Sequence, residues 1–143
     1  MLVDLAERAT PVTVTTTTGR ALTGTIVLAA TDVIVISGEH GSATYVRIDH
    51  IGSLRHGPGG RPLDTPAGGR AAPRPTTFGA LLADLAPDRP RVALDVAGQS
   101  GLLTGELRAA GRDVLTIRLD GDPPGTVHVA VAQLSALVLL ASG

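Results

Sequence analysis

Short stretches of alternating apolar and polar residues recur along the chain and predict a mainly β protein. The alternation is clearest at Val12 and Val14 and at Val127 and Val129, as expected for strands that bury one face. Turns rich in glycine and proline separate these stretches. Ten strands are expected, over residues 12–18, 21–30, 32–38, 43–49, 51–55, 91–97, 102–110, 113–119, 126–132 and 134–140.

The pattern also repeats itself along the chain. Asp32-Val33-Ile34-Val35-Ile36 recurs as Asp113-Val114-Leu115-Thr116-Ile117, and Tyr45-Val46-Arg47-Ile48 recurs as His128-Val129-Ala130-Val131. The extra residues of the second copy fall in turns, where a duplicated fold tolerates insertions. Each copy is therefore predicted to form five strands.

A short amphipathic helix is expected before each set of strands, around Leu2 and Leu5 in the first copy and around Leu82 and Leu85 in the second. The chain then divides into a first domain over 1–56, a linker over 57–77 and a second domain over 78–143. The linker holds five Gly, five Pro and three Arg, a composition that favours a connecting segment without a core.

Several single positions have structural interpretations. Gly24 and Gly105 lie inside the second strand of each copy, where a glycine marks a sharp bend or a close backbone approach. Asp32 and Asp113 precede equivalent strands and are expected to accept backbone hydrogen bonds in the turns there. The threonines at 15–18 are interpreted as β-branched strand residues with hydroxyls on the exposed face.

The strand spacing, with Gly24, Asp32-Val33-Ile34-Val35-Ile36 and Val46-x-Ile48-x-x-Ile51-x-x-Leu54, resembles Sm-like domains. The resemblance covers nearly the whole chain apart from the linker, once per copy, and extends distantly to the bacterial Sm-like RNA chaperone and to actinobacterial proteins of this kind. It implies two tandem five-stranded Sm-like/SH3-like barrels, each opened by a short helix. It also implies rings, in which the fourth strand of one barrel pairs with the fifth strand of the next.

Many Sm-like proteins bind uridine-rich RNA in two loops, and the resemblance places these loops at 29–32 and 48–51 in the first copy. Their equivalents in the second copy are residues 109–112 and 131–134. The family's pattern of Asp and Asn ligands is not reproduced in the first of these loops, and its basic pair is absent from the second. Residues kept as candidate contacts to RNA or to a protein partner are Arg47, Asp49, His50, Arg55 and Arg112.

Composition narrows the function classes. Aromatic residues make up 1% of the chain, which removes the stacking platforms on which single-stranded bases usually rest. The net charge of −1 gives no overall attraction for nucleic acid. All twelve basic residues are Arg, which, with the abundant Ala and Gly, indicates a GC-rich genome such as that of an actinobacterium.

No membrane association is expected, because the longest apolar run, 129–141, is interrupted by polar residues and is too short to span a bilayer. The acidic residues Asp4 and Glu7 argue against a signal peptide. The protein is therefore expected to be cytoplasmic.

No catalytic, cofactor or metal site is predicted. The chain has no Cys and four scattered His, whereas zinc sites need three or four converging ligands. The serines lack the G-x-S-x-G context of a nucleophile elbow, and the glycine runs of the linker lack the Lys of a phosphate loop.

The last strand is apolar on both faces, which indicates burial on both sides or an interface. A barrel of roughly 60 residues is also marginally stable alone. Assembly is therefore expected, within the chain or between chains, and the candidate interface residues are Val127, Val129, Val131, Leu137 and Leu139. The preferred hypothesis is a non-enzymatic, homo-oligomeric scaffold that binds protein partners; an RNA-binding Sm-like protein is the alternative.

Overall fold

The structure is a computed structural model that describes residues 11–38, 42–56, 75–121 and 123–140. All ten predicted strands are present, and no bound differs from the prediction by more than two residues. The first five are β1 (Pro11–Thr16), β2 (Ala21–Ala29), β3 (Val33–Ser37), β4 (Ala43–Arg47) and β5 (Ile51–His56). The second five are β6 (Arg91–Val96), β7 (Leu103–Ala110), β8 (Val114–Leu119), β9 (Thr126–Ala130) and β10 (Leu134–Leu139).

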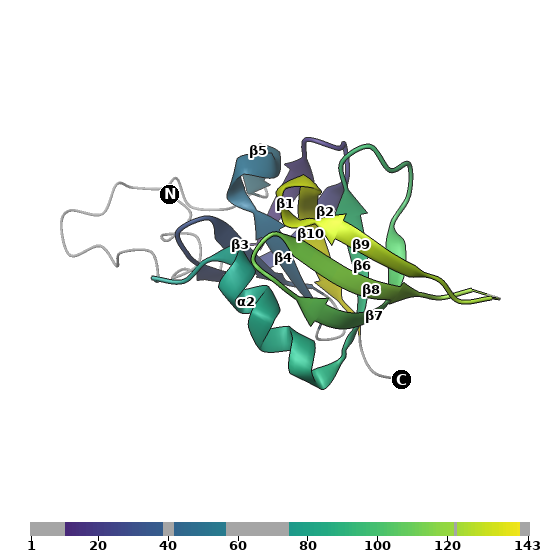
Figure 1. Cartoon of the computed structure of the whole chain (residues 1–143). Coiled ribbons are helices and arrows are strands. Elements are labelled where there is room, and N and C mark those ends of the chain that lie inside the picture. The colour runs from purple at the N-terminus through teal and green to yellow at the C-terminus, as the bar shows by residue number, and fades with distance from the viewer. Residues whose placement is uncertain (1–10, 39–41, 57–74, 122, 141–143) are drawn as a thin grey trace.

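The strands form one antiparallel sheet in the order β5-β1-β2-β3-β4-β10-β6-β7-β8-β9 (Figure 1). We call β1–β5 half one and β6–β10 half two. Within each half the strands have the same order: fifth, first, second, third, fourth. The prediction of a mainly β chain is confirmed, but the prediction of two tandem five-stranded barrels was wrong, because all ten strands belong to a single hydrogen-bonded sheet.

The junction between the halves is the pairing of β4 with β10. Residues 43–46 of β4 lie opposite residues 136–139 of β10, with Tyr45 facing Leu137. On its other side β10 pairs with β6, where Leu137 faces Leu94. Successive side chains of β10 point to opposite faces of the sheet: Leu137 belongs to one buried apolar cluster with Leu94, and Ala136 belongs to another with Val46. This burial on both faces accounts for the apolar residues on both.

Short 3-10 turns join the fourth and fifth strands of each half: η2 (Ile48–His50) and η4 (Val131–Gln133). In half one the backbone N–H of Ile48 donates to the carbonyl of Asp32, 2.9 Å away. In half two Val131 donates in the same way to Asp113, at 2.8 Å. The turn after the second strand therefore adjoins the turn after the fourth strand in both halves.

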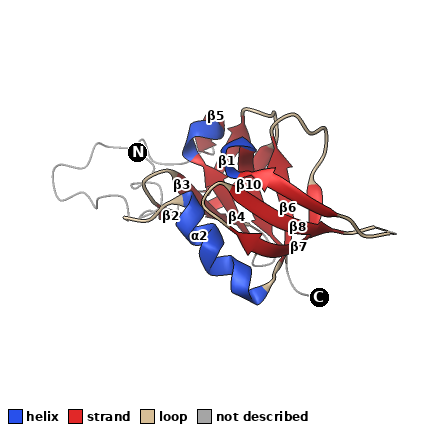
Figure 2. Ribbon diagram, in the orientation of Figure 1, coloured by secondary structure: helices blue, strands red, loops and turns tan. Residues whose placement is uncertain are grey.

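A single α-helix is present among the described residues, α2 (Phe78–Leu85) (Figure 2). Its cap residue Thr77 accepts a hydrogen bond from the N–H of Ala80 at 3.1 Å, as expected for an N-cap. The Asp32 carboxylate accepts a second one from the N–H of Phe78 at 2.7 Å. Asp32 thus accepts a backbone hydrogen bond, but from α2 rather than from the turn before its own strand. The predicted helix around Leu2 and Leu5 lies outside the described residues.

The short η3 (Ala86–Asp88) ends the helical segment before β6. Arg89 follows with a φ of 48°, a left-handed conformation that is uncommon for a residue with a side chain. The buried residues Phe78 and Leu82 fix one face of α2 against the sheet. No helix among the described residues is long and apolar enough to cross a membrane.

Two clusters of buried apolar residues form the core, and each includes residues from both halves. The larger is built mostly from half two and α2, but Ala30 and Val33 of half one belong to it. The smaller is built from half one, but Ala136 of β10 belongs to it. Burial of apolar area is the main driving force for folding, so the two halves stabilise each other across the junction.

Candidate binding site at the junction of the two halves

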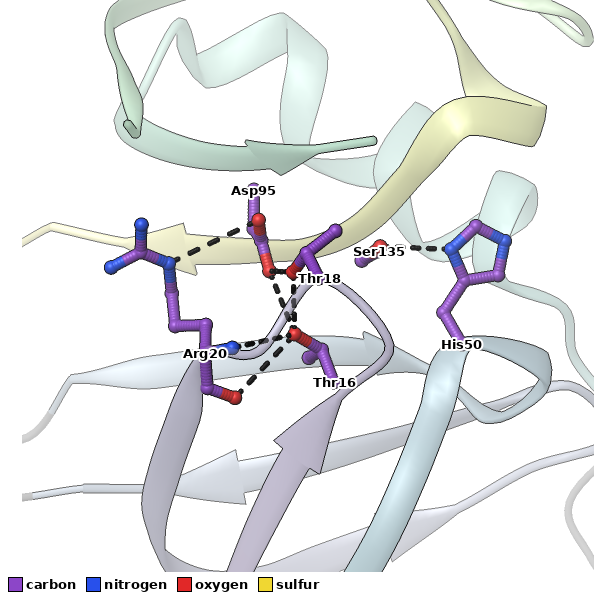
Figure 3. A network of polar contacts seen from close by, with 6 residues as sticks. All are labelled: Thr16, Thr18, Arg20, His50, Asp95 and Ser135. Carbon is purple, nitrogen blue, oxygen red and sulfur yellow. Dashed lines mark hydrogen bonds and ion pairs between the residues drawn. The ribbon is translucent and has the colours of Figure 1, made fainter. Parts of the chain in front are cut away.

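A buried carboxylate, Asp95 on β6, joins the two halves through polar contacts (Figure 3). Asp95 is only 4% exposed. Its Oδ2 accepts hydrogen bonds from the hydroxyls of Thr16, the last residue of β1, at 3.1 Å and of Thr18, in the turn that follows, at 2.7 Å. A buried carboxylate needs such donors to offset the loss of hydration.

The two threonine hydroxyls extend this network. Thr16 Oγ1 and Thr18 Oγ1 lie 2.6 Å apart, and the backbone N–H of Arg20 donates to Thr16 Oγ1 at 3.2 Å. The Arg20 Nε lies 3.9 Å from Asp95 Oδ1, within ion-pair range. The interpretation of Thr16 as an exposed strand residue was wrong, since it is 2% exposed; the bulge at Thr15/Thr16 changes the register there.

A second polar contact crosses the same junction. His50 Nδ1, in η2, lies 2.8 Å from Ser135 Oγ on β10 (Figure 3). In nucleophilic catalysis a His acts as the base that activates a neighbouring Ser hydroxyl. Ser135 is fully buried, so a substrate carbonyl has no path to its hydroxyl. The pair therefore serves as a structural contact between η2 and β10.

The other sequence-predicted contact residues do not converge on one site. Asp49 and His50 share η2 in half one, while Arg112 lies in the turn between β7 and β8 of half two. The Arg47 guanidinium lies 5.6 Å from the centre of the Phe78 ring, a cation–π distance. Arg55 is exposed on β5, at one end of the sheet.

The candidate interface residues fall into two groups. Leu137 and Leu139 lie on β10, at the junction within the chain. Val127 and Val129 lie on β9, which ends the sheet, and Val131 lies in η4. No described group of three or more His, Asp or Glu side chains is close enough to hold a metal ion.

Sequence reasoning missed Asp95, Thr16 and Thr18 as a group. One signal was available: Asp95 is an acidic residue between Leu94 and Val96 in an apolar predicted strand, and a charge there needs a buried partner. The partners themselves are 77 and 79 residues away along the chain, so no local pattern connects them.

A polar hollow of about 310 Å³ lies on half two. One wall is an exposed ion pair, in which Arg91 Nη1 donates to Asp120 Oδ1 at 2.9 Å and Arg91 Nη2 donates to Oδ2. The hydrogen bonds from Arg91 favour the ionised carboxylate and lower the pKa of Asp120; the same contacts raise the pKa of Arg91.

We expect the Arg91→Gln substitution to raise the pKa of the Asp120 carboxyl towards its ordinary value, because it removes the donated charge. Carboxyl chemical shifts followed by NMR across the acid range would measure this, with the exposed Asp88 as an internal control. In the unaltered protein the lowered pKa of Asp120 adds stability above the ordinary pKa of an Asp, and this contribution is lost as the pH falls through the folded-state pKa. An unchanged Asp120 titration in the variant would contradict the ion pair in solution.

Comparisons of the chain with protein-family models, with curated proteins and with solved structures found no match.

Proposed function

We propose that this chain is a non-enzymatic, Sm-like interaction protein that forms homo-oligomers through the two end strands of its sheet, β5 and β9, and presents the assembly to protein partners. The observation that supports this is the junction inside the chain. There, the fourth strand of one half pairs with the fifth strand of the other.

The two end strands of the sheet correspond to the two strands that pair at the junction. β5 is the fifth strand of half one, and β9 is the fourth strand of half two. A second copy can therefore place its β5 against β9 of the first copy and repeat the geometry of the junction. In the junction Tyr45 lies opposite Leu137. The sequence repeat matches Tyr45 to His128 and Leu137 to Leu54. The same register between two copies would therefore place His128 of one copy opposite Leu54 of the other.

Such a contact joins different surfaces of the two copies, so it produces either a closed ring or an open filament. The outer edges of β5 and β9 also favour pairing with another chain, because their N–H and C=O groups can form hydrogen bonds with a further strand. Sm-like barrels as a class form rings in this way, and this supports a closed assembly.

The contact between copies is expected to be weaker than the junction within the chain. At the positions equivalent to Ala136 and Val138 of β10, β5 carries Ser53 and the exposed Arg55. Less apolar area would be buried there, so the free energy of association per residue is smaller. The single chain is then the stable unit, and assembly depends on its concentration.

Native mass spectrometry of the protein purified from its own host tests this function. A homo-oligomer of whole chains, alone or with a protein partner, is the expected result. A monomer at all concentrations would contradict it. A nuclease-sensitive adduct, with preference for poly-U, would instead favour the alternative function, RNA binding by an Sm-like protein.

Proline substitutions in β9 give a sharper test of the assembly surface. Neighbouring residues of an edge strand point their N–H groups in opposite directions, one to the paired strand and one outward. Of the variants Val127→Pro and His128→Pro, one therefore removes only an outward N–H, and proline is tolerated there.

We expect that variant to remain folded, by circular dichroism, and to weaken association by about tenfold or more. The other variant should lose stability, because it breaks the pairing of β9 with β8. Light scattering after size-exclusion chromatography measures the oligomer. If both variants assemble like the unaltered protein, β9 is not the assembly surface.

A further inference from the structure

His128 is an exposed residue of β9, the end strand of half two that the proposed function assigns to assembly. Within the chain its Nδ1 lies 3.0 Å from the hydroxyl of Thr116 on the paired strand β8. Its counterpart in the sequence repeat is Tyr45 of β4, the strand of half one that pairs at the junction. The surroundings of Tyr45 therefore indicate where His128 would lie once a second copy pairs with β9.

Tyr45 is half-buried at the junction. It lies opposite Leu137 of β10 and packs against the larger apolar cluster, to which Leu137 and its neighbour Leu94 belong. Burial raises the pKa of the Tyr45 hydroxyl, because the charged phenolate would lose hydration there. The pairing of a fourth strand with a fifth strand thus creates surroundings that disfavour charge at this position.

The surface that a second copy would bring against His128 is apolar as well. Leu54 of β5 lies opposite Val14 of β1; Val14 belongs to the smaller apolar cluster, and Leu54 packs against it. In the register of the junction, Leu54 of the second copy lies opposite His128. The imidazole would then lose part of its hydration against Leu54, as the Tyr45 ring does against Leu137.

The groups diagonal to His128 on the same face are basic. Thr126 shares that face of β9 with His128, and Arg118 of β8 lies opposite Thr126. On the other side, the same register places His56 of the second copy opposite Thr126. Diagonal residues on paired strands are about 7–8 Å apart, so Arg118 and a protonated His56 would both repel a protonated His128. The nearest carboxylate along this row, Glu106, lies one strand further away, opposite Arg118.

We propose that His128 makes the contact between copies sensitive to pH, so that the copies associate when its imidazole is neutral and separate when it is protonated. This inference rests on the proposed function, because it requires a second copy paired with β9. An imidazole in water gains its proton near pH 6.5. A side chain that must be neutral in the assembly opposes association below that pH and leaves it unchanged well above.

Light scattering after size-exclusion chromatography of the full chain, at about pH 8 and about pH 5.5, tests the proposal. The association constant per contact should fall by about tenfold between the two values, because one unit of pH below the value for free imidazole leaves roughly a tenth of it neutral. Circular dichroism at both values checks that the chain stays folded.

Two substitutions remove the titrating group at the contact. His128→Gln stays neutral at both pH values, and His128→Tyr introduces the residue found at the junction. Both variants should lose the tenfold difference, and His128→Tyr should associate at least as tightly as the unaltered protein does at the higher pH. His50→Gln is the matched control, because His50 contacts Ser135 within the chain and the repeat itself carries Gln133 at that position; it should keep the difference.

The possible failures can be told apart. If the protein assembles and His128→Gln still associates about tenfold more weakly in acid, this inference is wrong, whereas the oligomeric function stands. A monomer at both pH values and at every concentration would overturn the inference and the proposed function together.

Discussion

Replacing Gly105 with alanine is expected to lower the free energy of unfolding by about 3 kcal/mol. Gly105 lies on β7, opposite Leu119 of the paired strand β8. A Cβ atom there would overlap the carbonyl oxygen of Arg118 and lie 2.8 Å from its carbonyl carbon and 2.9 Å from the Cα of Leu119. These atoms belong to the paired strand, so relief requires the sheet to separate locally.

Gly101→Ala is the matched control, because a Cβ at Gly101 would meet no atom within 4 Å and the residue has no positive φ. Urea unfolding followed by circular dichroism measures both variants. Gly24, at the equivalent position of half one, should behave like Gly105, since its Cβ would overlap the carbonyl oxygen of Ser37. Equal stabilities of the Gly105 and Gly101 variants would show that β7 and β8 do not approach as closely as described.

The second large effect is expected at the junction. Asp95→Ala should lower the free energy of unfolding by about 2 kcal/mol, because the buried hydroxyl of Thr16 and the exposed hydroxyl of Thr18 both lose their charged acceptor. Asp113→Ala, at an exposed residue of half two, is the control for the loss of an aspartate.

A double-mutant cycle separates the junction contact from other effects of losing Asp95. Thr18→Val keeps the shape of the side chain and removes the hydroxyl that donates to Asp95 Oδ2 at 2.7 Å. Combined with Asp95→Ala, it should show a coupling energy of about 1 kcal/mol. Strict additivity of the two changes would mean that the contact does not stabilise the folded chain.

The polar contacts at the junction also have a consequence for specificity. A buried polar group stabilises one arrangement and penalises others in which it lacks its partner. Asp95 finds hydroxyl partners only when β10 of half two lies beside β4 of half one. Half two with a different neighbour would lack these hydroxyl partners for the carboxylate, so the network favours the β4–β10 junction over the pairing of β10 with another strand.

The sequence by itself determined the elements of the fold. Strand positions follow from the period of two between buried side chains, and this local signal placed all ten strands within two residues. The repeat along the chain predicted that both halves have equivalent strands, and they have the same order in the sheet. The apolar residues on both faces of the last strand predicted burial on both sides, and side chains of β10 belong to both buried clusters, Leu137 to the larger and Ala136 to the smaller.

Only the tertiary structure decided what those elements contact. Nothing in the pattern of β10 says that its partner is β4 of the same chain, because any free strand edge offers the same backbone groups. The hydrogen bond from Phe78 to Asp32 joins residues 46 positions apart, and Asp95 meets Thr18 across 77. Local periodicity reports which face of a strand is buried; which residues meet there depends on long-range packing between the two halves.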